Sequence, residues 1–244
     1  MKIGTDFRPR LKDNILKAYN NLVKVEDKIL VIGDLHLPAE RKDYLDFCRD
    51  LKKKYKTNTT IFIGDVIDHH AISFHSKHPE AEAAQQEYGS VMESLKNWRK
   101  YFRDAQVCIG NHDERVHRLA AASGIPSMYL KDYQTVYGTP HWEWGHEFMI
   151  DGIYYTHGTG STGITPALNT AKAMGNSVVS GHVHSVAGIN YTCGPKDNKI
   201  FGFNIPNGVD KGHKLMYYGR NFLRKPVNGA GVVIDGTPYM EVMD

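Results

Sequence analysis

Short apolar runs that each end in a polar cluster recur along this chain and dominate its pattern of hydrophobic and polar positions. The first two runs end at Gly33 and Gly64, and an aspartate follows each glycine. Short apolar runs bounded by glycine predict buried β-strands. The five expected strands cover residues 29–32, 60–63, 106–109, 153–156 and 178–180.

Amphipathic segments lie between several of these runs. Two of them, 39–55 and 80–102, carry apolar side chains at helical spacing, which predicts helices that pack against a sheet. The inward faces are expected to hold Tyr44, Phe47, Leu51 and Tyr55 in the first segment and Tyr88, Met92, Leu95, Trp98 and Phe102 in the second. Strands that alternate with helices indicate an α/β fold with a largely parallel sheet, in which ligands bind outside the carboxyl ends of the strands.

The pattern after His184 predicts strands rather than helices. Strands are expected at 186–192 and 199–204, followed by a hairpin over 231–242 that turns at Asp235-Gly236. We expect one domain over 1–244, in which 186–244 forms a β-rich, antiparallel portion that packs on the preceding α/β portion. An amphipathic stretch within 1–27 predicts a helical extension that packs against this domain, with a nucleic-acid-binding arm as the alternative.

The composition is that of a soluble globular protein, with 244 residues of which 41% are hydrophobic and 23% charged. A domain of this size folds without a structural metal or disulfides, so a bound metal would serve chemistry. The three cysteines, Cys48, Cys108 and Cys193, are an odd number far apart in sequence and are expected to be reduced. Without a signal-peptide pattern or a long apolar run, we expect a cytoplasmic protein with no membrane partner.

Histidine is the unusual component of the composition. The chain has 13 histidines, and histidine is the commonest metal ligand. The net charge of +3 is too small to indicate a dedicated nucleic-acid-binding protein, but it does not exclude a nucleic-acid substrate.

Five polar clusters at the ends of the expected strands carry the candidate chemistry. Each cluster alone is ordinary for a loop, but the set supplies aspartate, asparagine and histidine at five strand ends. The clusters are Gly33-Asp34-Leu35-His36, Gly64-Asp65-Val66-Ile67-Asp68, Gly110-Asn111-His112-Asp113, His157-Gly158 and Gly181-His182-Val183-His184. This set resembles the sequence blocks of the calcineurin-like metallophosphoesterases over residues 28–190.

The resemblance implies a four-layer αββα sandwich with mixed sheets and a dinuclear metal site at the carboxyl ends of its strands. It assigns Asp34, His36, Asp65 and His184 to the first metal and Asp65, Asn111, His157 and His182 to the second. Oxygen and imidazole ligands without thiolate suit Mn, Fe or Zn, of which Mn is preferred here.

Such a site implies hydrolysis of a phosphoester. Two carboxylates against two divalent cations leave about two positive charges, which attract phosphate and lower the pKa of a bridging water. The resulting hydroxide would attack phosphorus in line. His112 is the candidate donor of the leaving-group proton, because Asn111 beside it would bind metal and the next side chain should point into the substrate space. In the family this histidine pairs with the acid that matches Asp68, for which a turn-stabilising carboxylate is the alternative. Asp113 and Glu114 are interpreted as helix-start residues.

One departure from the family pattern bears on the substrate. Protein phosphatases of this family carry an arginine directly after the acid that matches Asp68, whereas this chain has His69 and His70. Because a titratable histidine clamps a phosphate dianion less well than a guanidinium does, a phosphodiester is favoured over a monoester. His69, His70 and Arg115 are candidate substrate contacts, with a solvated histidine loop and an exposed helix arginine as the alternatives.

The segment 210–225 interleaves aromatic and basic residues. It predicts either a surface that stacks bases and neutralises phosphates or an ordinary edge strand. Residues 186–244 also resemble small phosphoesterases encoded by tailed phages, which would place the protein in the host cytoplasm. The leading hypothesis is therefore a metal-dependent phosphodiesterase, which includes nucleases. A phosphomonoesterase acting on nucleotides or phosphoproteins is the first alternative, and a non-catalytic scaffold with the same fold is the second.

Overall fold

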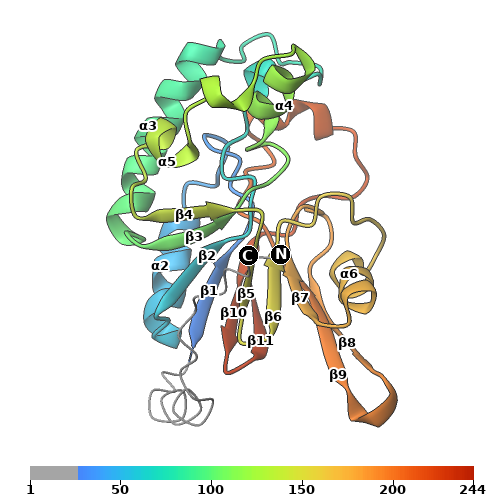
Figure 1. Ribbon diagram of the computed structural model, residues 1–244. Coiled ribbons are helices and arrows are strands. Elements are labelled where there is room, and N and C mark those ends of the chain that lie inside the picture. Colours follow the sequence, from blue (N-terminus) through green and yellow to red (C-terminus); the bar gives the residue numbers. More distant parts are fainter. Residues whose placement is uncertain (1–26) are drawn as a thin grey trace, which may run out of the picture.

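The computed structural model describes residues 27–244, so the helix expected within 1–27 lies outside the described residues. Within the described range the chain forms two mixed β-sheets that pack face to face (Figure 1). The six-stranded sheet has the order β11-β10-β1-β2-β3-β4, and the five-stranded sheet has the order β5-β6-β7-β9-β8.

The six-stranded sheet is parallel from β1 to β4, and β10 joins it by pairing antiparallel with all five residues of β1. Its strands are β1 (Lys28–Ile32), β2 (Thr59–Phe62), β3 (Ala105–Cys108), β4 (Trp142–Gly145), β10 (Gly229–Ile234) and β11 (Thr237–Val242). In the second sheet, β6, β7 and β9 are parallel and the two edge strands are antiparallel. These strands are β5 (Glu147–Ile150), β6 (Ile153–Thr156), β7 (Ser177–Ser180), β8 (Gly188–Cys193) and β9 (Lys199–Asn204).

Strand β1 shows why the central runs are apolar at every position. Leu30 and Ile32 point into the core between the six-stranded sheet and its helices, whereas Ile29 and Val31 point into the core between the two sheets. Because successive side chains of a strand alternate between faces, a strand buried on both faces must be apolar throughout.

Helices cover the outer face of each sheet, which completes the four-layer αββα sandwich expected from the sequence (Figure 1). The first set packs on the six-stranded sheet and consists of α2 (Tyr44–Tyr55), α3 (Ala84–Tyr101) and α5 (Tyr133–Tyr137). On the other side α6 (Pro166–Met174) packs against β7 and β9. The remaining helices are α4 (Arg115–Ala122), above the carboxyl ends of the strands, and the short 3₁₀ helices η1 (His70–Ile72), η2 (Ser127–Tyr129), η3 (Pro195–Asp197) and η4 (Lys214–Gly219). None of the helices in residues 27–244 is long and apolar enough to cross a membrane.

Three expectations are corrected by the fold. Strands β4 and β5 were not predicted: glutamate and glycine interrupt the apolar residues of β4, and β5 has only three consecutive apolar residues. Residues 186–244 do not pack as a separate antiparallel portion, since their strands complete both sheets and β9 runs parallel to β7. On α3 the buried face contains Glu87 rather than Tyr88, which is 41% exposed.

Candidate active site

The five polar clusters meet at one end of the sandwich. Strands β1, β2 and β3 of the first sheet and β6 and β7 of the second all run toward this end, so the loops that follow them lie side by side. The structure therefore brings together all the residues that the sequence assigns to metal binding, and both sheets contribute. They are Asp34, His36, Asp65, Asn111, His157, His182 and His184.

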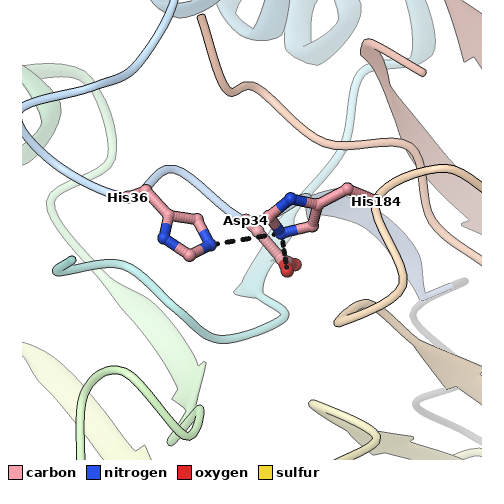
Figure 2. Close-up of side chains that lie close together, drawn as sticks. All are labelled: Asp34, His36 and His184. Carbon is pink, nitrogen blue, oxygen red and sulfur yellow. Dashed lines mark hydrogen bonds and ion pairs between the residues drawn. The ribbon is translucent and has the colours of Figure 1, made fainter. Parts of the chain in front are cut away.

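Asp34, His36 and His184 form the first cluster of ligand atoms (Figure 2). The Nε2 atom of His184 lies 3.0 Å from Oδ2 of Asp34 and 3.1 Å from Nε2 of His36. Since Nδ1 of His36 donates to Asp68 at 2.6 Å, the lone pair of its Nε2 points into the cluster. The other oxygen of Asp34, Oδ1, is buried and has no hydrogen-bond partner among residues 27–244.

Asp65, His157 and His182 form the second cluster. The Nε2 atom of His157 lies 3.1 Å from Oδ2 of Asp65, 3.1 Å from Oδ1 of Asn111 and 3.2 Å from Nδ1 of His182. Nδ1 of His157 donates to the carbonyl of Ile63 at 3.0 Å, which fixes the ring with Nε2 toward the cluster. Several acceptor atoms again converge on one point.

Asp65 lies between the two clusters. Its Oδ2 atom is 3.1 Å from Nε2 of His157 in the second cluster and 3.6 Å from Nε2 of His36 in the first. Its Oδ1 atom accepts a hydrogen bond of 2.7 Å from the backbone N–H of His112, which orients the carboxylate. An oxygen and imidazole donor set, with Oδ1 of Asp34 left unpaired among the described residues, fits divalent cations such as Mn, Fe or Zn.

Two glycines of the clusters permit this close approach. A side chain at Gly64 would collide with the ring of His157, and a side chain at Gly110 would collide with the carboxylate and backbone of Asp65. Gly64 also adopts a φ of +111°, a backbone conformation that other residues rarely adopt. The glycines at these strand ends therefore make room for the ligand side chains.

Charge accumulates in the clusters and shifts the pKa of their members. Burial raises the pKa of the Asp65 carboxyl, but the nearby His157 and His112 lower it by more than burial raises it. The pKa of Asp65 therefore lies well below its usual value. Burial likewise lowers the pKa of His157, but the carboxylates of Asp65 and Asp34 raise it to about 10. Without a cation, the buried carboxylates are thus balanced by protonated histidine, a role that bound metal ions would take over.

His112 and Asp68, the expected proton-donating pair, are in contact. Asp68 is fully buried, and its Oδ1 atom lies 2.9 Å from Nδ1 of His112 and 2.6 Å from Nδ1 of His36. Burial lowers the pKa of His112, but Asp65 and Asp68 raise it above its usual value. Because Nδ1 faces Asp68, Nε2 is the atom that His112 presents to the cavity described below.

The three candidate substrate contacts are placed differently from what the sequence predicted. Arg115 is only 6% exposed, and its guanidinium donates to the carbonyls of Asp68 at 2.7 Å and His69 at 2.8 Å while lying against the ring of His112. The ring of His69 pairs with the hydroxyl of Tyr137 at 2.7 Å, and His70 is buried. None of the three lines the cavity above the clusters, because His70 and the guanidinium of Arg115 are buried and the ring of His69 is bonded to Tyr137.

Sequence reasoning missed two buried carboxylates that hold these loops in place. Asp113, expected at a helix start, is fully buried and accepts from the backbone N–H groups of Gly110 at 2.9 Å, Ile67 at 2.9 Å and Val66 at 3.4 Å. On α3, Glu87 accepts from the N–H groups of His70 and Ala71 at 2.6 and 2.8 Å. Hydropathy offers no signal for either residue, because both carboxylates bond to backbone groups distant in sequence or hidden in a turn.

A cavity of about 620 Å³ opens above the two clusters. Its floor includes His112, His182 and His184, and its side is formed by the segment 211–226. We call the basic and aromatic residues of this side the basic wall, which consists of Lys211, Tyr218, Arg220, Phe222, Arg224 and Lys225. The segment forms the 3₁₀ helix η4 and loops, so the edge strand considered from the sequence is not present there.

The model of the calcineurin-like phosphoesterase family matches residues 27–216. A comparison with curated proteins finds no match.

Solved structures with similar folds include Vacuolar Protein Sorting 29 from Cryptosporidium parvum, at 14% identity and a TM-score of 0.42, covering 89% of this chain and 97% of that one. The Pseudomonas putida nuclease MPE is similar at 15% identity and a TM-score of 0.42, covering 88% of this chain and 87% of that one. The E. coli phosphoesterase YfcE is similar at 16% identity and a TM-score of 0.40, covering 84% and 87%.

The contacts of Asp113 generate a stability prediction. Asp113→Ala leaves three buried N–H groups without an acceptor, so we expect the free energy of unfolding to fall by about 3 kcal/mol or more in urea denaturation. Glu114→Ala is the control, because the side chain of Glu114 is partly exposed and forms an ion pair with the exposed His146, at 3.6 Å. Equal unfolding free energies for the two variants would contradict the role assigned to Asp113.

Proposed function

This chain belongs to the calcineurin-like phosphoesterase family, and we propose that it hydrolyses phosphodiesters with the help of two divalent cations. The observation that carries the proposal is the position of Asp65, whose Oδ2 atom faces the imidazoles of both clusters. A carboxylate in this position can bridge two cations, which lie about 3.5–4 Å apart in dinuclear hydrolases. The unpaired Oδ1 atom of Asp34 supports the same interpretation, since a buried carboxylate oxygen without a donor is suited to a cation.

The first cation would be held by Asp34, His36, Asp65 and His184, and the second by Asp65, Asn111, His157 and His182. When bound, such a pair polarises phosphoryl oxygens and makes hydroxide available at neutral pH. All seven of these side chains are present and clustered, which favours an enzyme over a non-catalytic scaffold. Mn is the metal that we propose, with Fe and Zn compatible with the same donors.

His112 is the residue that we propose as proton donor to the leaving oxygen. Asp68 holds its Nδ1 atom at 2.9 Å and so directs Nε2 to the cavity, where a leaving group would lie. Arg115 supports this arrangement as a positioning residue, because it donates to the carbonyl of Asp68 and packs against the ring of His112. The buried carboxylate also fixes the tautomer of His112, as in other histidine-dependent hydrolases.

The surroundings of the pair favour a diester over a monoester. A monoester dianion is best held by a bidentate guanidinium next to the metal ligands. The arginine nearest to His112 is Arg115, and its guanidinium is committed to two backbone carbonyls outside the cavity lining. The lower charge of a diester needs no such clamp, so the diester is the better fit.

Model substrates test the reaction directly. We expect the protein to hydrolyse bis-p-nitrophenyl phosphate faster than p-nitrophenyl phosphate, to lose activity on chelation and to regain it with Mn²⁺. Asp65→Asn should reduce kcat/KM by about a thousandfold or more, because a bridging ligand is lost. The control is Asp50→Asn, on the exposed face of α2.

Full activity after chelation would contradict a metal-dependent reaction. Faster hydrolysis of the monoester would instead support the phosphomonoesterase alternative and would show that a cation elsewhere in the cavity clamps the dianion.

The role of His112 predicts a dependence on the leaving group. His112→Asn should lower kcat by about 10²- to 10⁴-fold for diphenyl phosphate, whose phenolate leaves poorly without a proton. The loss should be smaller for bis-p-nitrophenyl phosphate, whose leaving group is more stable as an anion. His141→Asn, with a half-exposed ring, is the control. An equal loss for both esters would contradict proton donation by His112.

A further inference from the structure

The basic wall lines the cavity but has no role in the reaction proposed above. The cavity volume of about 620 Å³ falls in the range of pockets that hold a whole drug-sized ligand, which is far more than a phosphate group needs. The cavity therefore has room beside the wall for part of a substrate beyond the reacting phosphate.

The charge of the wall indicates what this part of the substrate carries. Its four cationic residues belong to a segment, 211–226, that contains no aspartate or glutamate. Within the described part of the chain, neither Lys211 nor Arg224 forms an ion pair, and both side chains are exposed. The ammonium of Lys225 donates to the carbonyls of Gly219 and Arg220, at 3.4 and 3.0 Å. Exposed cations without acidic partners favour a ligand with several phosphates.

The aromatic residues of the wall add a second requirement. Phe222 is 59% exposed although it lines the cavity, and its ring meets the ring of Tyr218 edge-on at 6.2 Å. An exposed aromatic ring among cations is the arrangement with which proteins stack the bases of single-stranded nucleic acids. Bases paired in a duplex are already stacked and cannot use such a ring.

The wall is anchored to the rest of the fold. The ring of Tyr218 stacks on His75 at 4.6 Å, and Lys214 pairs with Glu82 at 3.2 Å. Beneath it, Leu215 and Met216 are buried in a small core with Ala39 and Val209. These contacts hold η4, and with it the ring of Tyr218 that Phe222 meets, beside the metal ligands.

We propose that the basic wall binds the nucleotides next to the scissile phosphate of a single-stranded nucleic acid, with Phe222 stacking on a base and Lys211 and Arg224 contacting flanking phosphates. The proposal rests on the phosphodiesterase function and names its substrate class. It also explains why the sequence interleaves aromatic and basic residues in this segment.

Binding of a fluorescein-labelled twelve-nucleotide oligothymidylate, measured by fluorescence anisotropy in the presence of chelator, tests the wall separately from catalysis. We expect Phe222→Ala to weaken binding about tenfold, the usual effect of losing one stacked base. The neighbouring Leu223→Ala is the matched control, since Leu223 is fully exposed and does not line the cavity.

A second variant tests the phosphate contacts. In the double variant Lys211→Gln/Arg224→Gln, the slope of log affinity against log salt should fall by about 0.7 for each cation removed. Lys53→Gln/Lys96→Gln, which removes two exposed cations from α2 and α3, should leave the slope unchanged.

The outcomes separate the two proposals. Stacking by Phe222 would be overturned if the protein bound a duplex of the same length as tightly as the single strand. It would also be overturned if Leu223→Ala weakened binding as much as Phe222→Ala does. An unchanged salt slope in Lys211→Gln/Arg224→Gln would overturn the phosphate contacts. If the Mn²⁺-loaded enzyme hydrolyses bis-p-nitrophenyl phosphate but does not cleave the oligonucleotide, the substrate class is wrong while the phosphodiesterase function stands.

Discussion

The placement of one carboxylate, that of Asp65, is the constraint on which the rest of the site depends. Its backbone carbonyl accepts hydrogen bonds from the N–H groups of Leu35 and His36 at 3.2 and 2.9 Å, so it sets the position of the loop after β1. Its side chain accepts from the N–H of His112 and faces His157. A single residue thus joins loops that follow β1, β2, β3 and β6, and the two sheets meet at its carboxylate.

Burying this much charge and polarity is costly unless every group finds a partner. Part of this cost is offset because the buried carboxylates of Asp113 and Glu87 accept hydrogen bonds from backbone N–H groups of the site loops. Asp68 links the first cluster to the proposed proton donor, because it accepts hydrogen bonds from both His36 and His112. A cation would supply the partner that the buried Oδ1 atom of Asp34 lacks among the described residues.

The sequence was informative where a residue type and its neighbours in the chain determine the outcome. Apolar runs that end in glycine predicted β1 and β2 to within one residue at each end, because nearly every position of these two strands is buried. The polar residues after these runs could be placed at one edge because parallel strands end on the same side. The sequence did not predict β4, whose Trp142 is buried against Phe62 at 4.5 Å, because glutamate and glycine break its apolar pattern.

Contacts between residues distant in the chain were beyond sequence reasoning. Asp113 and Glu87 are hydrophilic by type, and only the folded backbone shows that they face N–H groups that need an acceptor. Arg115 was expected either on the surface or at the substrate, yet two carbonyls in the loop after β2 hold its guanidinium inside the protein. These errors all concern charged residues, for which the three-dimensional partner decides between burial and exposure.

Calorimetric titration of Mn²⁺ into metal-free protein tests the central claim, that Asp65 joins two metal sites, most directly. The account predicts that two ions bind per chain, that Asp65→Asn weakens both binding events and that His182→Ala weakens one of them. Binding of a single ion to the unaltered protein, or weakening of only one of two events by Asp65→Asn, would contradict it.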